Sequence, residues 1–257
     1  MMEIWQAIIL GLLQGLTEFL PVSSSGHLVI VQNFLGVIRT GVTFDIAVHL
    51  GTALAVAYYF RDQLLAIARN FRLLALLIVA SIPAAVFGLA FQDFLESLFS
   101  QVVAVGFALL VTGTILWLAE TYSRQGKDAK KLEQISYQDA LIIGLGQAVA
   151  IVPGISRSGS TIATALLRNV NRESAAEFSF LMSLPVILGA AFLELIDLGS
   201  AASSLSVVPI FAGLVTAFFS GLAAIYFLLA IIRRHSLKIF AYYTWFLGAI
   251  VLLWNLI

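Results

Sequence analysis

Two polar stretches interrupt an otherwise apolar chain, and both contain side chains that could perform chemistry. The first, QGLTEFLPVSSSGH, runs from Gln14 to His27 and contains a carboxamide, a carboxylate, three serines and an imidazole. The second, VPGISRSGST, runs from Val152 to Thr161 and contains an arginine among serines, glycines and a threonine. Together they supply a cation for phosphate, a hydroxyl nucleophile, a base and a carboxylate for a metal ion. This combination predicts phosphoryl transfer.

The spacing within the first stretch suggests particular roles. Gln14 and Glu18 are four residues apart, so they share one helix face and could both contact a ligand or cation; a helix-packing hydrogen bond is the alternative. Glu18 offers oxygen ligands of the kind that Mg²⁺ and Ca²⁺ prefer. Ser24 and His27 are three residues apart at a turn, which can bring hydroxyl and imidazole together. We expect His27 to activate Ser24 for attack on phosphorus, and a competing scheme makes His27 itself the nucleophile.

The two stretches also contain helix-starting residues. Serine and glycine before HLVIVQNFLG are good helix starters, so one of the three serines is expected to be a cap. In the second stretch, a helix is expected to open at TIATALLR, from Thr161, and its free N–H groups would favour an anion. Arg157 adds a planar, permanently charged group that suits phosphate.

The elements that must position these residues lie in a membrane. The chain has 61% hydrophobic and 11% charged residues and a mean hydropathy of +1.01, which is typical of a polytopic membrane protein. Six apolar runs approach the roughly 20 residues that a spanning helix needs. They are approximately 45–60, 73–91, 102–119, 178–196, 207–231 and 237–257. The formal net charge of zero and the lack of a basic, aromatic patch argue against nucleic-acid binding.

Basic residues orient the chain, because Lys and Arg are enriched in cytoplasmic loops. They gather after Arg61, within 120–138 and around Arg233, and are missing from 92–101 and 197–206. The first three connections are therefore predicted to be cytoplasmic and the other two external. The stretches 1–38 and 139–167 must then each enter and leave on one side, as re-entrant hairpins whose polar tips line a cavity.

The chain also repeats itself. An offset of 133 residues aligns GLLQGLTEFLPVSSSGH with GLGQAVAIVPGISRSGS and pairs Gln14 with Gln147 and Ser23 with Ser156. Each half contains a hairpin and three spans, and since three is odd, the second copy must be inverted. We expect an all-α membrane domain of about ten helices, with repeat 1 at about 1–119, a cytoplasmic linker at about 120–138 and repeat 2 at about 139–257. The breaks of inverted repeats meet near the midplane, so 14–27 and 153–161 should lie against each other.

At this level of detail the two stretches resemble the signature motifs of the undecaprenyl-diphosphate phosphatases, the bacitracin-resistance protein family. The resemblance covers essentially the whole chain, including FDIAVHLGTALAV and FSFLMSLP. It implies hydrolysis of undecaprenyl diphosphate to undecaprenyl phosphate and inorganic phosphate, which recycles the lipid carrier for peptidoglycan synthesis and confers bacitracin resistance. It also implies a multi-pass protein of the bacterial cytoplasmic membrane, a site that opens outward, and a divalent metal cofactor, Mg²⁺ or Ca²⁺.

The resemblance assigns roles residue by residue. Glu18 is linked to metal binding and catalysis, and Ser24 and His27 belong to the catalytic loop, with Arg157 at the diphosphate. Gln14 stands where the family often has Glu, so it is expected to be a weaker metal ligand. The remaining residues of both tips are expected to bind substrate: Ser23, Ser25, Gly26, Gly154, Ser156, Ser158, Ser160 and Thr161.

Other interpretations stay open. Inverted repeats with broken helices are also typical of transporters, so a transporter or lipid flippase is the main alternative function. Glu18, His27 and Arg157 could instead form a purely structural connection between the hairpins. The oligomeric state is undetermined, with a homodimer as one alternative. His49 and the remaining acidic residues, Asp45 among them, lie near segment ends and are predicted to be interfacial or packing residues.

Overall fold

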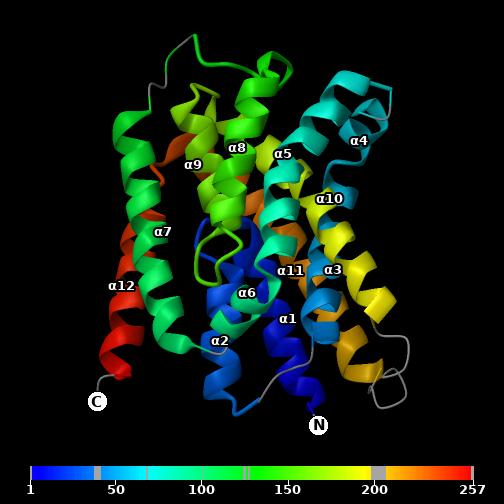
Figure 1. The fold of residues 1–257 in the computed structure, drawn as a ribbon, viewed down its shortest axis with the longest axis vertical. Helices are drawn as coiled ribbons and strands as arrows, with labels where there is room; N and C mark the ends of the chain where they lie inside the picture. The colour runs from blue at the N-terminus through cyan, green and yellow to red at the C-terminus, as the bar shows by residue number, and fades with distance from the viewer. Residues whose placement is uncertain are drawn as a thin grey trace.

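The computed structural model describes residues 2–37, 42–67, 69–99, 101–123, 126, 128–197 and 207–255. Over these residues the protein is all-α, with twelve α-helices and one short 3-10 helix, which confirms the predicted fold class. Helices α1 (Ile4–Phe19) and α2 (Ser24–Phe34) form a first hairpin, and α8 (Tyr137–Val149) and α9 (Arg157–Leu167) form a second. The first hairpin enters from the lower end of the molecule and the second from the upper end (Figure 1).

Six longer helices correspond to the six predicted spans. They are α3 (Val42–Tyr59), α5 (Phe71–Ala90), α7 (Val102–Tyr122), α10 (Arg172–Asp197), α11 (Val207–Arg234) and α12 (Lys238–Trp254). By length and composition, α5, α7, α10 and α11 could each cross a membrane, and α3 could do so together with α4 (Arg61–Ile67), from which it is bent by 80°. Helix α12 is shorter but apolar. The short helices α4 and α6 (Gln92–Leu98) lie in connections and raise the number above the expected ten.

The connections that were predicted to be cytoplasmic gather at one end. Helix α4 and the start of α8 lie at the upper end of Figure 1, whereas the start of α1 and the end of α12 lie at the lower end. Side chains join these connections to one another. Arg72 donates to the carbonyl oxygen of Ile135 over 2.5 Å, and the backbone N–H of Leu237 donates to the Glu120 carboxylate over 3.2 Å. The basic groups of three connections therefore share one face of the molecule.

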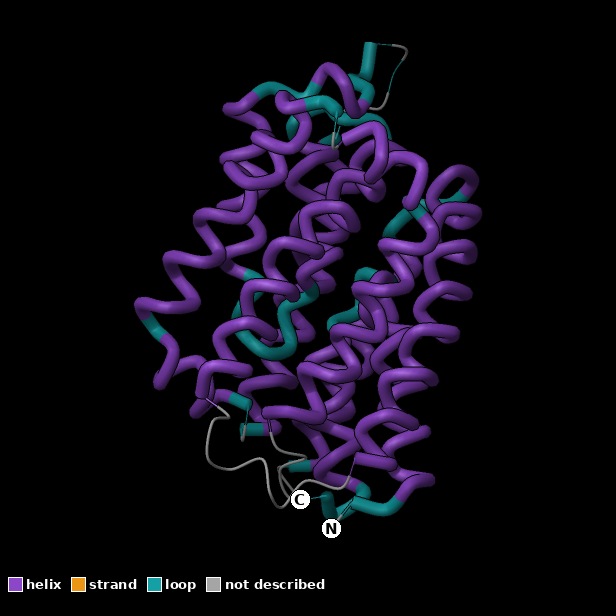
Figure 2. Tube along the Cα trace, turned by 90° about the vertical axis from the view of Figure 1, so that its right-hand side faces the viewer, coloured by secondary structure: helices purple, strands orange, loops and turns teal. Residues whose placement is uncertain are grey.

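Small residues allow the hairpins to pack closely against the longer helices. A Cβ added at Gly11 of α1 would lie 2.3 Å from the carbonyl oxygen of Gly213 on α11, and one at Gly144 of α8 would lie 2.4 Å from that of Ala80 on α5. Close backbone approach of this kind is a common basis of helix association in lipid. In Figure 2, loop segments interrupt the helices at mid-height, within the bundle. Close packing against the longer helices therefore holds the breaks of both hairpins inside the helix bundle.

The outer surface of the bundle is apolar. Large hydrophobic side chains are exposed along several helices, for example Phe107 on α7, Phe192 on α10 and Phe227 on α11. An apolar surface of this extent is unfavourable in water and favourable against lipid tails. The structure thus agrees with the composition in describing a membrane protein.

Candidate active site

The two hairpin tips touch, as the repeat predicted. The backbone N–H of Gly154 donates to the Ser25 hydroxyl over 3.4 Å, and the Ser158 hydroxyl donates to the Leu20 carbonyl oxygen over 3.0 Å. A Cβ added at Gly26 would lie 3.1 Å from the Cα of Gly154. The absence of side chains at these two glycines lets the tips approach this closely.

Both outgoing helices begin with the same cap. The Ser23 hydroxyl accepts a hydrogen bond from the N–H of Gly26 over 3.2 Å, and the Ser156 hydroxyl accepts one from Gly159 over 3.0 Å. A serine that binds the N–H three residues later satisfies one of the free donors of a helix start. Ser23 is thus the serine that serves as the cap in the first tip, and its repeat partner Ser156 does the same in the second.

The second outgoing helix begins earlier than expected. Its first residue is Arg157 and not Thr161, because the Ser156 cap allows the helix to start inside the polar stretch. Thr161 is fully buried, with its hydroxyl 2.6 Å from that of Ser179 on α10 and donating to the Arg157 carbonyl oxygen over 2.8 Å. Ser160, which was also predicted to bind substrate, is buried as well, with 4% of its surface exposed. Thr161 therefore holds α9 against α10.

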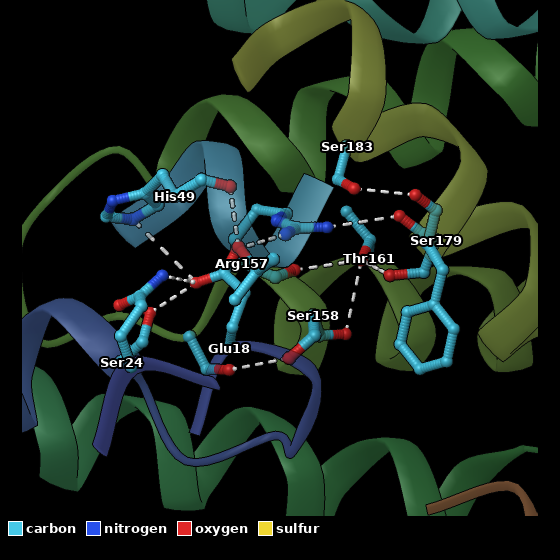
Figure 3. A network of polar contacts seen from close by, with 12 residues as sticks. Glu18, Ser24, His49, Arg157, Ser158, Thr161, Ser179 and Ser183 are labelled. Atoms are coloured by element: carbon cyan, nitrogen blue, oxygen red, sulfur yellow. Dashed lines mark hydrogen bonds and ion pairs between the residues drawn. The ribbon is translucent and has the colours of Figure 1, made fainter. Parts of the chain in front are cut away.

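Glu18 is the centre of the polar network at the tips (Figure 3). Its Oε2 accepts hydrogen bonds from the Ser24 hydroxyl over 2.5 Å and from Gln14 Nε2 over 3.0 Å, so Gln14 makes the intrahelical hydrogen bond that was the alternative to a ligand contact. Its Oε1 accepts a hydrogen bond from the Arg157 guanidinium, which also donates to the Ser179 carbonyl oxygen. The Glu18 and Arg157 side chains are 6% and 17% exposed. One carboxylate thus joins the hydroxyl of one repeat to the cation of the other.

His49 also belongs to this network, although it lies outside both polar stretches. Its Nε2 lies 3.8 Å from Glu18 Oε2, and its Nδ1 lies 2.6 Å from the carbonyl oxygen of Asp45. His49 and Asp45 both line the cavity described below, and His49 faces Glu18, which their assignment as interfacial or packing residues did not include. The available signal was their spacing of four residues, which gives them one helix face.

His27 was expected to contact Ser24, but its hydrogen bonds go to other residues. Its Nδ1 lies 2.7 Å from the Ser23 carbonyl oxygen, and its Nε2 lies 2.7 Å from the hydroxyl of Tyr243 on α12, against whose ring it stacks. A carbonyl only accepts, so Nδ1 donates and Nε2 accepts from the tyrosine. Ser23 has a φ of 70°, in a region that is unfavourable for residues other than glycine. His27 and Tyr243 therefore hold the turn that presents Ser24.

A similar support holds the second tip. Thr112 of α7 donates through its hydroxyl to the Gly154 carbonyl oxygen over 3.0 Å and accepts from the N–H of Ser156 over 3.0 Å. Gly154 has a φ of +95°, and a Cβ added there would lie 2.8 Å from the Val105 carbonyl oxygen. Only glycine meets both conditions. Neither Thr112 nor Tyr243 lies in a polar stretch that could have identified it.

A cavity of about 1110 Å³ opens beside the network. Among the predicted site residues, its lining contains Glu18, Ser23, Ser24, Ser25, Ser156 and Arg157. Asp93 and Glu96 of α6 add acidic groups, while Ala84 of α5 and Val186 and Ile187 of α10 form an apolar wall. His27, Ser158 and Thr161 instead make their polar contacts within the protein. A polar floor beside an apolar wall suits a molecule with a charged head and a hydrocarbon tail.

The side-chain oxygens around Glu18 are candidate ligands for a divalent cation. Among the described residues no group of three or more His, Cys, Asp and Glu could hold a metal ion. The oxygens near Glu18 are nevertheless of the kind that hard cations prefer, and the Oε1 of Gln14 is buried without a hydrogen-bond partner. Mg²⁺ is often bound by one or two carboxylates together with phosphate oxygens of the substrate. Glu18, which lines the cavity, therefore fits a cation that arrives with a phosphorylated ligand, whereas Gln14 is fully buried behind the cavity lining.

The chain is similar in sequence to known proteins over nearly its whole length. The family model described as bacitracin resistance protein BacA matches residues 7–250. The undecaprenyl-diphosphatase of Carboxydothermus hydrogenoformans is 46% identical, over 98% of this chain and 97% of its own length. That of Halothermothrix orenii is 45% identical over 98% of both chains, and undecaprenyl-diphosphatase 3 of Bacillus cereus is 44% identical over 96% of both.

Proposed function

Because the chain belongs to the bacitracin resistance protein family, we propose that it hydrolyses undecaprenyl diphosphate to undecaprenyl phosphate and inorganic phosphate. This reaction recycles the lipid carrier for peptidoglycan synthesis and confers resistance to bacitracin. The observation that carries the proposal is the contact of Ser24 and Arg157, from opposite hairpins, with one carboxylate, that of Glu18. A nucleophile, a proton acceptor and a phosphate-binding cation thus meet at the edge of one cavity.

Ser24 is the nucleophile in this proposal, and Glu18 is its base. The Ser24 Oγ attacks the terminal phosphorus, its proton passes to Glu18 Oε2, and the bond to the bridging oxygen breaks to release undecaprenyl phosphate. Water then hydrolyses the phosphoserine. Support comes from the 2.5 Å hydrogen bond that Ser24 donates to this oxygen. His27 is less suited to be the nucleophile, because it is 6% exposed and both its ring nitrogens are engaged.

Arg157 binds the phosphoryl group as charge develops on it. In the free protein its guanidinium is paired with Glu18. Once Glu18 has accepted the serine proton, that carboxyl is neutral and attracts the guanidinium less, while the phosphoryl oxygens attract it more. The N-terminus of α9, where Arg157 is the first residue, adds backbone donors for the same anion. The ion pair therefore keeps the cation in place until the substrate arrives.

A divalent cation, Mg²⁺ or Ca²⁺, is the proposed cofactor. Glu18, which lines the cavity, would hold it together with diphosphate oxygens, and the unpartnered Oε1 of the buried Gln14 is a second oxygen one helical turn away. When bound, it neutralises negative charge on the diphosphate. Gln14 brings no charge of its own, so Glu18 is the single carboxylate on which this role depends.

The proposed location is the bacterial cytoplasmic membrane, with the cavity open to the outside. Support comes from the basic connections, which lie at the upper end in Figure 1, opposite the start of α1. Loops rich in Lys and Arg favour the cytoplasmic side. The cavity lining includes α6 residues Asp93 and Glu96, from a connection that has no Lys or Arg.

Phosphate release tests the proposal directly. Purified protein in detergent is given undecaprenyl diphosphate with Mg²⁺, with Ca²⁺ or with a chelator, beside the Glu18→Ala variant. We expect phosphate release that requires a divalent cation and is abolished in the variant. A transporter or flippase would release none. Trapping and mapping the phosphorylated intermediate then separates the two nucleophiles, since a phosphohistidine at His27 would refute the role of Ser24.

A further inference from the structure

Gln147 of α8 is a buried polar side chain with no partner in the described protein. The residue is 1% exposed, and neither its Oε1 nor its Nε2 has a hydrogen bond. A carboxamide that is removed from water without a compensating hydrogen bond is destabilising. Gln147 nevertheless lines the same cavity as Glu18, Ser24 and Arg157. Its amide N–H₂ group and amide oxygen are therefore free to form hydrogen bonds with a molecule bound in the cavity.

Comparison of the repeats shows why this glutamine is unpaired. Gln147 corresponds to Gln14, whose Nε2 donates to Glu18 one helical turn later. The residue four positions after Gln147 is Ile151, which lies beyond the end of α8 and whose side chain has no acceptor. The second repeat thus keeps the carboxamide but lacks the carboxylate that would accept its hydrogen bond.

We propose that Gln147 binds the diphosphate of the substrate, with its Nε2–H₂ group donating to a phosphoryl oxygen. This inference rests on the proposed function and adds a binding residue to it. A diphosphate in the cavity needs donors beyond Arg157, and a carboxamide supplies two N–H groups without a further charge. Uncharged donors that are fixed in a water-poor site bind an oxyanion effectively. The substrate thereby satisfies a group that the free protein leaves unpaired.

The Gln147→Met variant tests this role, because it keeps the length of the side chain and removes its polar atoms. We expect kcat/KM for undecaprenyl diphosphate to fall roughly 10- to 100-fold, the range for a hydrogen bond to a charged group. The Kd of a non-hydrolysable polyprenyl methylene-diphosphonate should rise by a similar factor. The Tm without ligand should stay equal or increase, since an unpaired buried amide has been removed.

Two further variants make the result specific. Gln147→Glu retains the shape and adds negative charge, so it should bind the diphosphonate even less tightly than Gln147→Met. Ser123→Ala is the matched control: the Ser123 hydroxyl is also buried without a partner, at the end of α7 outside the cavity lining, so kcat/KM should not change. An intermediate Kd for Gln147→Met between wild type and Gln147→Glu supports the proposal.

Two outcomes would overturn it. If Gln147 only holds an ordered water molecule, Gln147→Met will have wild-type kcat/KM and a wild-type Kd for the diphosphonate. Equal Kd values for Gln147→Glu and wild type would lead to the same conclusion even if the methionine variant failed to fold. Failure of the proposed function is distinguishable, because then the wild-type protein itself would release no phosphate.

Discussion

Glu18 of the first repeat and Arg157 of the second form an ion pair where the two hairpin tips meet. Both side chains are largely buried, so each depends on the other for compensation of its charge. The contact joins residues that the sequence separates by half of the chain. The site is therefore built from residues of both repeats. Substitution of either Glu18 or Arg157 leaves the other charge buried without its partner.

Replacement of Glu18 by Gln should abolish most of the activity. The amide cannot accept the Ser24 proton, and general base catalysis contributes about 10²- to 10⁴-fold to a rate. We expect kcat for phosphate release to fall within that range. Glu96→Gln is the control, because Glu96 lines the same cavity but is exposed and pairs with Gln92. Similar losses in both variants would contradict a specific role for Glu18.

Substitution of Arg157 by Lys should be severe although the charge is kept. Lysine cannot donate both to a phosphoryl oxygen and to the Ser179 carbonyl with the planar geometry of arginine. We expect a loss of roughly 100-fold or more in kcat, comparable to the loss of an oxyanion donor. Arg72→Lys, at the end of the bundle that carries the basic connections and outside the cavity lining, should be near normal. Near-normal turnover of Arg157→Lys would remove the argument that Arg157 clamps the phosphate.

Loss of the Tyr243 hydroxyl should affect the rate through His27. Tyr243→Phe keeps the stacked ring and removes the hydrogen bond to Nε2, which loosens the support of the Ser23 turn. A typical hydrogen bond implies a decrease in kcat of about 2- to 10-fold, with little change in KM. The neighbouring Tyr242 is exposed, so Tyr242→Phe should retain wild-type kcat. A change in KM alone would argue against this positioning role.

His49 should matter for turnover although it lies outside both polar stretches. His49→Leu removes the nitrogen that faces Glu18 Oε2 across 3.8 Å, and with it a polar neighbour of the reacting carboxylate. We expect kcat/KM to fall by no more than about 10-fold, because the contact is longer than a hydrogen bond. His235→Leu, in the connection between α11 and α12 and outside the cavity lining, serves as the control. Equal activity of the two variants would return His49 to a packing role.

The side on which the cavity opens can be determined by labelling. The chain contains no cysteine, so single-cysteine variants have no background. Glu96 lines the cavity and Arg69 lies in the basic connection between α4 and α5, and both residues are exposed. The two variants are Glu96→Cys and Arg69→Cys. Intact cells treated with a membrane-impermeant maleimide should label Glu96→Cys and spare Arg69→Cys. The reverse pattern would place the cavity on the cytoplasmic side.

Much of the architecture was predictable because its signals are local. Apolar runs predicted the spanning helices, and helix-breaking residues predicted the two hairpins. The repeat then predicted that the tips meet, which the contacts of Gly154 with Ser25 and of Ser158 with Leu20 confirm. The start of α9 was placed too late, because apolar periodicity marked the helix but the Ser156 cap decides where it begins.

The sequence by itself determined which chemical groups the site contains; the tertiary structure decided which of them act on one another. Spacing suggested that Ser24 and His27 would pair, but Ser24 contacts Glu18 and His27 contacts Tyr243, 216 residues away. His49 reaches Glu18, and Gln147 faces the cavity unpaired, for the same reason. Composition and periodicity report local preferences, whereas the neighbours of a side chain across helices depend on how those helices cross and on where small residues let them approach.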